Sequence, residues 1–274
     1  MTKTTSLKDI EIMNFYTDVF KSSFLSKGFK PSSDFSVVKK NKNAMFMYDN
    51  QKLHRYLNEY KITVFSQTRE QVDRFKRRNI KHTVGKNKIS VLEFNNDFFE
   101  LKGKKHKKIR RYRNMYTNTC KIDVRDEPNS IEEVIEFIEK WKIIRKDAYF
   151  QLFAGYDMNF FREYYYRFRD RLIPFYFYYE GVLVGYNIIE RVDKNKYNLL
   201  LRKVNTNYTN LCLFVDYYAM EKIFRNINEP IFLNMEGDVG SKGLLNYKTQ
   251  SFHVPIRVFE MYDIRIPKTI GTLL

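Results

Sequence analysis

Apolar residues recur at helical spacing in the middle of the chain. Residues 131–144 alternate apolar and charged positions with a period close to 3.6, which predicts an amphipathic helix. Ser130 and Glu133 match the capping box that begins many helices. A second helix is expected over about 158–170, beginning at Asp157. The face expected to pack comprises Ile131, Val134, Ile135, Ile138, Trp141 and Ile144 in the first helix, and Phe160, Phe161, Tyr164, Tyr165 and Phe168 in the second.

The pattern changes to that of strands after residue 172. Residues 173–179 and 182–190 are largely apolar and flank the pair Glu180-Gly181, which predicts a β-hairpin. Another strand is expected at 197–203. The remaining predicted elements are a helix near 211–226, a strand at 231–235, a glycine-rich loop and a last strand at 255–264.

The first part of the chain repeats this order more faintly. Expected elements are a helix within 1–30, two short strands within 31–50 around a polar turn, a short helix at 51–60, a strand at 61–65, a helix at 66–79 and a strand at 89–94. The polar segment KIDVRDEPNS is the most plausible boundary, giving an N-terminal half at 1–122 and a C-terminal half at 123–274. The predicted fold is therefore α/β (α+β), with a mixed, mostly antiparallel sheet flanked by helices.

Composition narrows the possible classes of protein. The 274 residues are 43% hydrophobic and 17% aromatic, which supports a packed core and excludes general disorder. The two cysteines form no CxxC and the four histidines form no HExxH, so we expect neither a disulfide framework nor a metal site. No segment offers about 18 uncharged apolar residues, and no signal peptide is evident. We expect a soluble cytoplasmic protein without a transmembrane segment.

Charge adds a candidate partner. The chain has 49 Lys and Arg against 32 Asp and Glu, a formal net charge of +17, which favours nucleic acid, an anionic membrane or phosphorylated substrates over a merely solvated basic surface. Eight cations lie within residues 102–113 without an intervening acid. As a helix, this segment has a narrow apolar stripe and cations elsewhere, so a phosphate backbone would relieve its self-repulsion. A surface tract of the nuclear-localisation type is the alternative.

Two segments resemble one known family. FFELKGKKHKKIRRYRN (98–114) resembles the "L-x-G-K-K-x-x-K-x-R-x-x-x-N" segment of proteins similar to the C-terminal part of phosphatidylglycerol lysyltransferase. FLNMEGDVGSKGLLNYKTQSFHVP (232–255) resembles the closing motif of that family, "N-x-E-x-D-x-G-x-x-G-L-x-x-x-K", with Pro255 slightly later than the family places its proline. The residues on the closing motif are Asn234, Glu236, Asp238, Gly240, Gly243, Leu244 and Lys248.

The resemblance implies a fold and an activity. It implies two tandem GNAT-like (N-acetyltransferase-like) halves and an acyl- or aminoacyl-transferase, and it leaves the donor and the acceptor open. Our expectation is that the protein moves an aminoacyl group from charged tRNA to an amine or hydroxyl acceptor. Donors bound through coenzyme A usually meet a glycine-rich loop at a helix start, and residues 202–214 contain no glycine. We therefore expect aminoacyl-tRNA rather than acetyl-CoA as donor, and no cofactor is assigned with certainty.

The closing motif supplies the candidate catalytic residues. Glu236 or Asp238 could bind an α-amino group or act as base, and Lys248 could stabilise the oxyanion or a terminal ribose-phosphate. Tyr247 is a further catalytic candidate. Gly237 and Gly240 allow tight turns that present N–H groups to a ligand, and Lys242 is a further binding candidate. A plain turn with solvated charges is the alternative.

The basic segment supplies candidate phosphate-binding residues. Arg110 and Asn114 fall on the Arg and Asn of the family motif, although Arg110 could instead bridge the two halves of the chain. The phosphate-binding candidates are Lys104, Lys105, Lys108, Arg110 and Arg113, with Asn114 as a hydrogen-bonding partner.

Other residues have weaker signals. His253 could act as a base but a lone histidine is more often structural, and Cys212 is interpreted as packing. The aromatic residues that could line a pocket or belong to the core are Tyr149, Phe150, Phe153, Tyr156, Tyr164, Tyr165 and Tyr166.

Two other functions stay open. A transferase of the same fold could modify DNA or RNA bases, as in phage-type hypermodification. A non-catalytic basic module that binds nucleic acid is the alternative from another class.

Overall fold

The protein is described by a computed structural model. It describes residues 11–23, 25, 30–33, 37–41, 44–47, 61–78, 80–145, 148–237 and 241–267. The chain divides into two compact units, one formed by 1–25, 90–236 and 243–257 and the other by 26–89, 237–242 and 258–274. Both units are therefore built from separate stretches of chain. The proposed boundary between tandem halves at residues 122 and 123 stays a prediction.

A mixed sheet forms the centre of the first unit. Its strand order is β5-β10-β9-β8-β7-β6, where β5 contributes its residues from Ser90 onward. Neighbours from β6 to β9 are antiparallel, whereas β10 runs parallel to β9. The strands are β5 (Thr83–Phe94), β6 (Asp123–Arg125), β7 (Leu172–Tyr179), β8 (Val182–Arg191), β9 (Lys196–Val204) and β10 (Ile231–Gly237).

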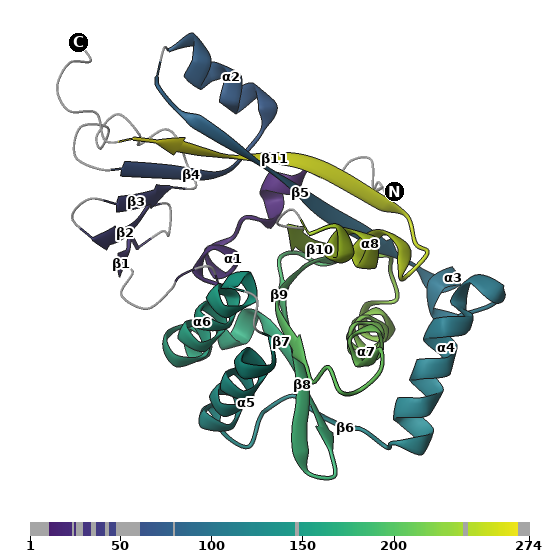
Figure 1. Ribbon diagram of the computed structural model, residues 1–274. Coiled ribbons are helices and arrows are strands. Elements are labelled where there is room, and N and C mark those ends of the chain that lie inside the picture. The colour runs from purple at the N-terminus through teal and green to yellow at the C-terminus, as the bar shows by residue number, and fades with distance from the viewer. Residues whose placement is uncertain are drawn as a thin grey trace. The chain divides into compact units, whose positions relative to one another are not determined.

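Helices cover both faces of this sheet. On one side of β7–β9 lie α5 (Ile131–Ile144) and α6 (Ala148–Glu163), and on the other lies α7 (Leu211–Ile227), against which α4 (Lys107–Asn114) packs (Figure 1). The core on the α7 side joins Phe177 of β7 to Phe214 of α7. The remaining helical segments of this unit are η2 (Ile12–Phe15), α1 (Asp18–Ser22), α3 (Asn96–Phe99), η4 (Lys104–His106), the π-helix η5 (Met115–Thr119), η6 (Tyr166–Arg171) and α8 (Lys242–Gln250, largely in this unit).

The second unit has a smaller mixed sheet. Its strand order is β1-β2-β3-β4-β11, in which β3 and β4 run parallel and the other neighbouring pairs are antiparallel. Helix α2 (Arg69–Arg77) begins at Thr68, whose hydroxyl and backbone N–H form a complete capping box with Gln71. The strands are β1 (Lys30–Pro31), β2 (Val37–Asn41), β3 (Ala44–Met47), β4 (Lys61–Gln67) and β11 (Ile256–Ile266). Both sheets together confirm the predicted fold class.

The predicted hairpin is confirmed. Glu180 and Gly181 have φ of 50° and 77°, the left-handed pair that a two-residue type I′ turn requires. Strands β7 and β8 pair across it from Tyr179 and Val182 back to Leu172 and Glu190. A short turn with matching twist therefore sets the register of both strands.

The predicted start of α5 is confirmed, but its capping differs in detail. Ser130 accepts a hydrogen bond from the Glu133 N–H at 3.1 Å, as a helix N-cap does. The Glu133 carboxylate accepts from the backbone N–H of Asn129 at 3.3 Å rather than from that of Ser130. It also accepts from the Tyr178 hydroxyl at 2.7 Å, so the cap ties α5 to β7.

We expect Ser130→Ala to lower the free energy of unfolding by about 1 kcal/mol, because the Glu133 N–H loses its acceptor. Denaturant unfolding followed by circular dichroism measures the loss. Ser130→Asp, which keeps an acceptor at the cap, should stay close to the parent protein. Equal stability of the Ala and parent proteins would show that the cap contributes nothing.

Some predicted elements differ from the structure. Helix α6 does not begin at Asp157: it begins at Ala148, and Asp157 lies buried in its interior. Asp157 cannot act as a cap because its carboxylate is engaged by Lys203 and Tyr186. The helix expected within 1–30 is reduced to the short η2 and α1 among the described residues. The predicted segment 51–60 lies outside the described residues.

Length and hydropathy bear on any membrane role. Among the helices that the structure describes, none combines the length and the apolar character needed to cross a bilayer.

Candidate active site where strands β9 and β10 separate

Strands β9 and β10 pair only over their first residues. Their parallel register joins Lys196–Asn198 to Phe232–Asn234, and beyond these residues both strands continue without pairing to each other. The side chains of Asn198 and Asn234 are buried at this point, and their amides are joined by a hydrogen bond of 2.9 Å. Asn234 also accepts from the Glu236 N–H at 2.9 Å. An amide side chain therefore satisfies a backbone donor where the ladder ends.

Glu236 occupies a strained position at the end of β10. Its φ of 61° is in the left-handed region, which disfavours residues with a side chain. Its Oε1 is buried and has no hydrogen-bond partner among the described residues. Burial raises the pKa of this carboxyl to about 8, although the nearby Lys248 acts in the opposite direction. Glu236 can therefore accept or release a proton near neutral pH.

Lys248 brings an ammonium group to the same place. It lies on α8, its side chain is buried, and its Nζ donates to the main-chain carbonyl of Glu236 at 2.9 Å. Burial of a lysine ammonium costs free energy unless hydrogen bonds or opposite charges replace its hydration, so this position depends on polar groups around it. The closing segment thus folds back on itself to place a cation next to the carboxylate.

Two adjacent cations follow a bulge in β9 and lie on opposite faces of the sheet. Ile188 of β8 pairs with Leu201, and its neighbour Ile189 pairs with Leu199, so Leu200 is an extra residue in β9. Side chains alternate beyond the bulge. Arg202 accordingly pairs with a residue of α7, and Lys203 pairs with one of α6.

On the α7 face, Arg202 forms an ion pair with the buried Asp216. The Asp216 carboxylate also accepts from the Tyr247 hydroxyl at 2.7 Å and from the Asn187 amide at 3.1 Å. The Arg202 guanidinium lies 4.9 Å from the centre of the Tyr247 ring. Burial, followed by Asp216, raises the pKa of the Tyr247 phenol well above its usual value. Tyr247 is therefore a neutral group in a fixed orientation.

On the opposite face, Lys203 and Asp157 form a second buried ion pair. Their Nζ and Oδ2 are 2.5 Å apart, and each side chain is only 5% exposed. The Tyr186 hydroxyl donates to the same carboxylate, and Trp141 of α5 has its ring centre 4.9 Å from Lys203 Nζ. Both ion pairs act on the Glu236 carboxyl: Asp157 raises its pKa, whereas Lys203 and Arg202 lower it. Glu236 therefore lies between two fixed sets of charges.

Comparison with solved structures identifies the fold. L-PGS from Bacillus licheniformis is similar to this chain, with a TM-score of 0.58 and 14% sequence identity. The match covers 92% of this chain and 87% of that protein. The C-terminal domain of a putative lysylphosphatidylglycerol synthetase from Agrobacterium fabrum is also similar, with a TM-score of 0.56 and 9% sequence identity. The match covers 94% of this chain and 90% of that domain. A tandem GNAT protein from the clavulanic acid biosynthesis pathway is similar over 99% of this chain and 92% of its own, with a TM-score of 0.52 and 7% sequence identity. The chain has a tandem GNAT-like fold.

The GNAT-like fold was expected from the sequence, and the structural comparisons confirm it. No protein-family model and no curated protein matches the sequence. These three structures share at most 14% sequence identity with this chain, so they bear on the fold alone.

Three of the four predicted catalytic residues lie together in the first unit. Glu236 and Lys248 are in direct contact, and Tyr247 binds Asp216. The fourth, Asp238, lies outside the described residues, as does Gly240. Gly237 ends β10 and Lys242 begins α8. The catalytic and binding roles of all these residues stay predictions.

The basic segment divides into engaged and free cations. Arg110 donates to the carbonyls of Leu101 and Gly103, and Arg113 donates to the Asn114 side chain at 3.2 and 3.3 Å. These contacts place Arg110 in the support of the loop before α4. Lys104, Lys105 and Lys108 are exposed on the surface. Their proposed phosphate contacts stay predictions.

The weaker candidates have varied surroundings. His253 is exposed and left-handed, with its ring centre 6.3 Å from that of His106. Tyr164 and Tyr165 are buried in the core, whereas Tyr166 is 68% exposed. Cys212 is a half-buried free cysteine.

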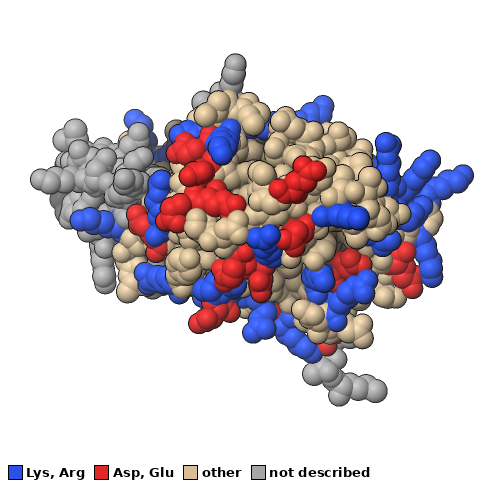
Figure 2. Space-filling view, turned by 90° about the horizontal axis from the view of Figure 1, so that it is seen from below, with Lys and Arg blue, Asp and Glu red and all other residues tan. Residues whose placement is uncertain are grey.

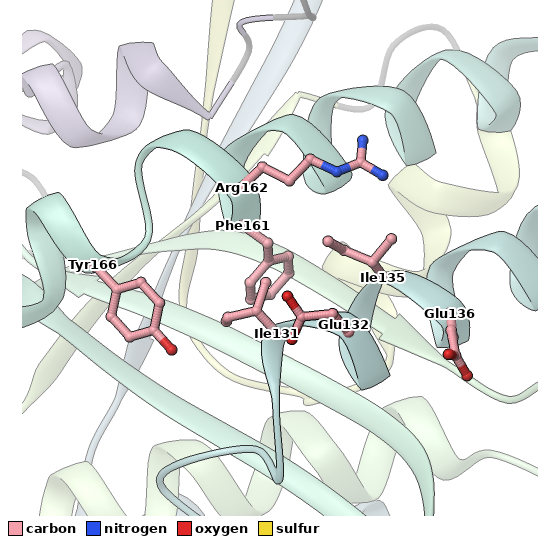
Figure 3. A pocket seen from close by; sticks show the side chains of 7 residues that line it. All are labelled: Ile131, Glu132, Ile135, Glu136, Phe161, Arg162 and Tyr166. Atoms are coloured by element: carbon pink, nitrogen blue, oxygen red, sulfur yellow. The ribbon is translucent and has the colours of Figure 1, made fainter.

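A surface hollow between α5 and α6 is separate from the candidate active site. It has a volume of about 420 Å³ and is lined by Glu132 and Glu136 of α5 and Arg162 of α6, together with the apolar side chains of Ile131, Ile135 and Phe161 (Figure 3). None of the residues of the two ion-pair sets lines it. The strand separation, rather than this hollow, therefore gathers the groups that can perform acid–base chemistry.

Proposed function

We propose that this protein is an acyltransferase that moves an aminoacyl group from charged tRNA to an amine or hydroxyl acceptor. The tandem GNAT-like fold supports acyl transfer, and the similarity to proteins named as lysylphosphatidylglycerol synthetases supports an aminoacyl donor. The net charge of +17 supports a polyanionic partner. The observation that carries the proposal is the buried Oε1 of Glu236, which has no hydrogen-bond partner among the described residues, in a residue that Lys248 contacts.

Glu236 acts as the general base in this proposal. The acceptor nitrogen or oxygen attacks the ester carbonyl of the donor, and its proton passes to the Glu236 carboxylate. The new C–N or C–O bond forms as the ester C–O bond to the ribose breaks, and the ribose oxygen leaves with the proton. A base whose pKa is near the working pH is efficient in both directions, and that of Glu236 is raised to about 8.

Lys248 stabilises the negative charge that develops on the carbonyl oxygen. Its ammonium is already desolvated and fixed by the Glu236 carbonyl at 2.9 Å, so little reorganisation is needed when the charge appears. Tyr247 and Arg202 are both held by Asp216 on the α7 side of the sheet. The buried Asp216 is the anchor for both.

The donor preference rests on the loop before α7. Residues 205–210 contain no glycine, and the turn into α7 is made by Asn210 in a left-handed conformation with φ of 54°. A side chain is therefore present where glycine-rich loops bring their backbone close to a pyrophosphate. This supports a donor that does not bind through coenzyme A.

The test is transfer from charged tRNA. The purified protein is incubated with tRNAs carrying labelled amino acids and with a panel of amine and hydroxyl acceptors, and labelled product is separated by mass. Transfer should require the charged tRNA, and a free amino acid with uncharged tRNA should give none. Transfer from acetyl-CoA alone would overturn the assignment of charged tRNA as the donor. The absence of transfer from any charged tRNA would overturn the whole proposal.

We expect Lys248→Met to lower the transfer rate by roughly 100- to 1,000-fold, because one preorganised donor to the oxyanion is lost. Initial rates under saturating donor measure this loss. Lys222→Met, which removes an exposed lysine of α7, is the control and should keep the parent rate. A Lys248→Met protein with an unchanged rate would show that this ammonium serves only the fold.

A further inference from the structure

Helix α4 and the turn before it carry several cations that have no partner within the described part of the chain. Within the described residues, none of the side chains Lys104, Lys105, Lys107 and Lys108 forms an ion pair or hydrogen bond, and Arg111 only contacts the Tyr112 ring, at 5.6 Å. All five are exposed. Lys and Arg gather at the right-hand edge of the surface, over α4, whereas acidic residues gather nearer the centre (Figure 2). The cations are therefore available to an external anion.

The apolar side of α4 is fully committed to α7. Ile109 is 2% and Tyr116 1% exposed. Tyr116 donates to the Thr209 carbonyl at 2.8 Å, and its ring centre lies 5.2 Å from that of Phe214. Arg110 fixes the preceding loop through the Leu101 and Gly103 carbonyls. The helix is anchored, so its cations stand on a fixed support.

The start of α4 is an unfavourable place for so many cations. Its N-cap, His106, makes no capping hydrogen bond, and the first turn contains no acid. Positive charge near a helix N-terminus opposes the macrodipole, and like charges spaced i,i+4, as Lys104 and Lys108 are, repel. His106 is 1% exposed, neither ring nitrogen has a partner among the described residues, and burial followed by Lys105 lowers its pKa. An anion beside the exposed lysines would relieve their mutual repulsion and the unfavourable charge at the helix start.

We propose that α4 binds the phosphate backbone of an RNA duplex, without reading its sequence. This inference rests on the proposed function, in which the duplex is the acceptor arm of the donor tRNA. Lysine is a point charge that matches phosphate oxygens and does not specify a base. Because α7 lies between α4 and strands β8 and β9, and a helix is about 10 Å thick, the duplex stays outside while its single-stranded end reaches the site.

Two other anionic partners fit these residues less well. Single-stranded nucleic acid is usually bound by stacking on exposed aromatic rings, and Tyr112 and Tyr116 of this segment are buried. An amphipathic helix that binds a membrane inserts an apolar face, and the apolar face of α4 is covered by α7. What the described part of α4 exposes is chiefly positive charge, which suits a duplex backbone.

The test uses a blunt RNA hairpin without an amino acid, titrated with the parent protein and with Lys104→Glu/Lys108→Glu. We expect the variant to bind at least ten times more weakly, and the slope of log affinity against log salt to fall by about 2, one for each lost phosphate contact. Glutamate near a helix N-terminus is favourable, so this variant should fold as well as the parent. Circular dichroism verifies its fold.

A matched control has the same change of charge on the other face of the unit. Lys140→Glu/Arg162→Glu, on α5 and α6, should bind the hairpin as the parent does. Equal weakening by both variants would overturn the inference in favour of bulk charge. Tighter binding of a single-stranded oligonucleotide, or of phosphatidylglycerol vesicles, than of the hairpin would overturn it in favour of those partners.

Binding and transfer fail separately. If hairpin binding depends on α4 but no transfer from charged tRNA occurs, the RNA-binding surface is supported and the proposed transferase activity is overturned. If Lys104→Glu/Lys108→Glu does not change the transfer rate at low donor concentration, the RNA-binding role of α4 is overturned and the proposed transferase activity stands.

Discussion

Glu236→Gln lowers the rate of aminoacyl transfer by roughly 100- to 10,000-fold, the range expected when a general base is lost. Glutamine keeps the shape of the side chain but cannot take the proton of the acceptor. Rates measured at single turnover separate this effect from product release. Glu229→Gln, which changes an exposed carboxylate paired with Lys194, is the matched control and should keep the parent rate.

The pH profile gives an independent readout of the same group. Because the pKa of Glu236 is raised to about 8, the carboxyl is mostly protonated at pH 6 and mostly ionised at pH 9. Only the ionised form is a base, so the parent rate should rise through this range with its midpoint near pH 8 and level off above about pH 9. The residual rate of Glu236→Gln should lack this step. A parent-like rate or profile in the variant would contradict the role of Glu236.

Asp157→Ala lowers the free energy of unfolding by about 3–5 kcal/mol, because it leaves the Lys203 ammonium buried without its carboxylate. The Tyr186 hydroxyl loses its acceptor as well. Urea denaturation followed by tryptophan fluorescence measures the change. Trp141 is the only tryptophan of the chain, and its ring contacts Lys203, so the probe lies at the site itself.

A second substitution separates charge from packing. Asp157→Ala/Lys203→Met removes both members of the pair and should recover much of the lost stability, because no uncompensated charge stays buried. Glu229→Ala, which breaks an exposed ion pair, should cost less than about 1 kcal/mol. A loss below 1 kcal/mol in Asp157→Ala alone would show that Lys203 reaches another partner or water.

Local signals predicted the elements that local interactions determine. The Glu180-Gly181 turn needs two left-handed residues, and the start of α5 needs an acceptor at Ser130; both requirements are visible in a few letters of sequence. The fold class followed from the order of such elements. The closing segment was also recognised, and it brings together Glu236 and Lys248, 12 positions apart, although their roles stay predictions.

The two ion pairs were missed because their partners are distant in sequence. Lys203 and Asp157 are 46 positions apart, and their pairing depends on the docking of α6 on the sheet. A usable signal was nevertheless present: Asp157, Asp216 and the pair Arg202-Lys203 each interrupt an otherwise apolar stretch. A charge in a buried element must find a partner, so such interruptions predict one another. Asp157 was instead interpreted as a helix cap.

The extra residue Leu200 has a consequence for how this protein can change over evolutionary time. Arg202 and Lys203 lie opposite Asn187 and Tyr186 of β8, and residues that pair across two strands share a face of the sheet. Loss of Leu200 would therefore remove the bulge and leave both ion pairs on their own faces. An added residue directly before Arg202, with the register to β8 kept, would instead move each cation one position along the strand and exchange their faces. Asp216 and Asp157 would then each lie on the same face as the wrong cation. Descendants of this sequence should vary the lengths of their loops before they lengthen β9.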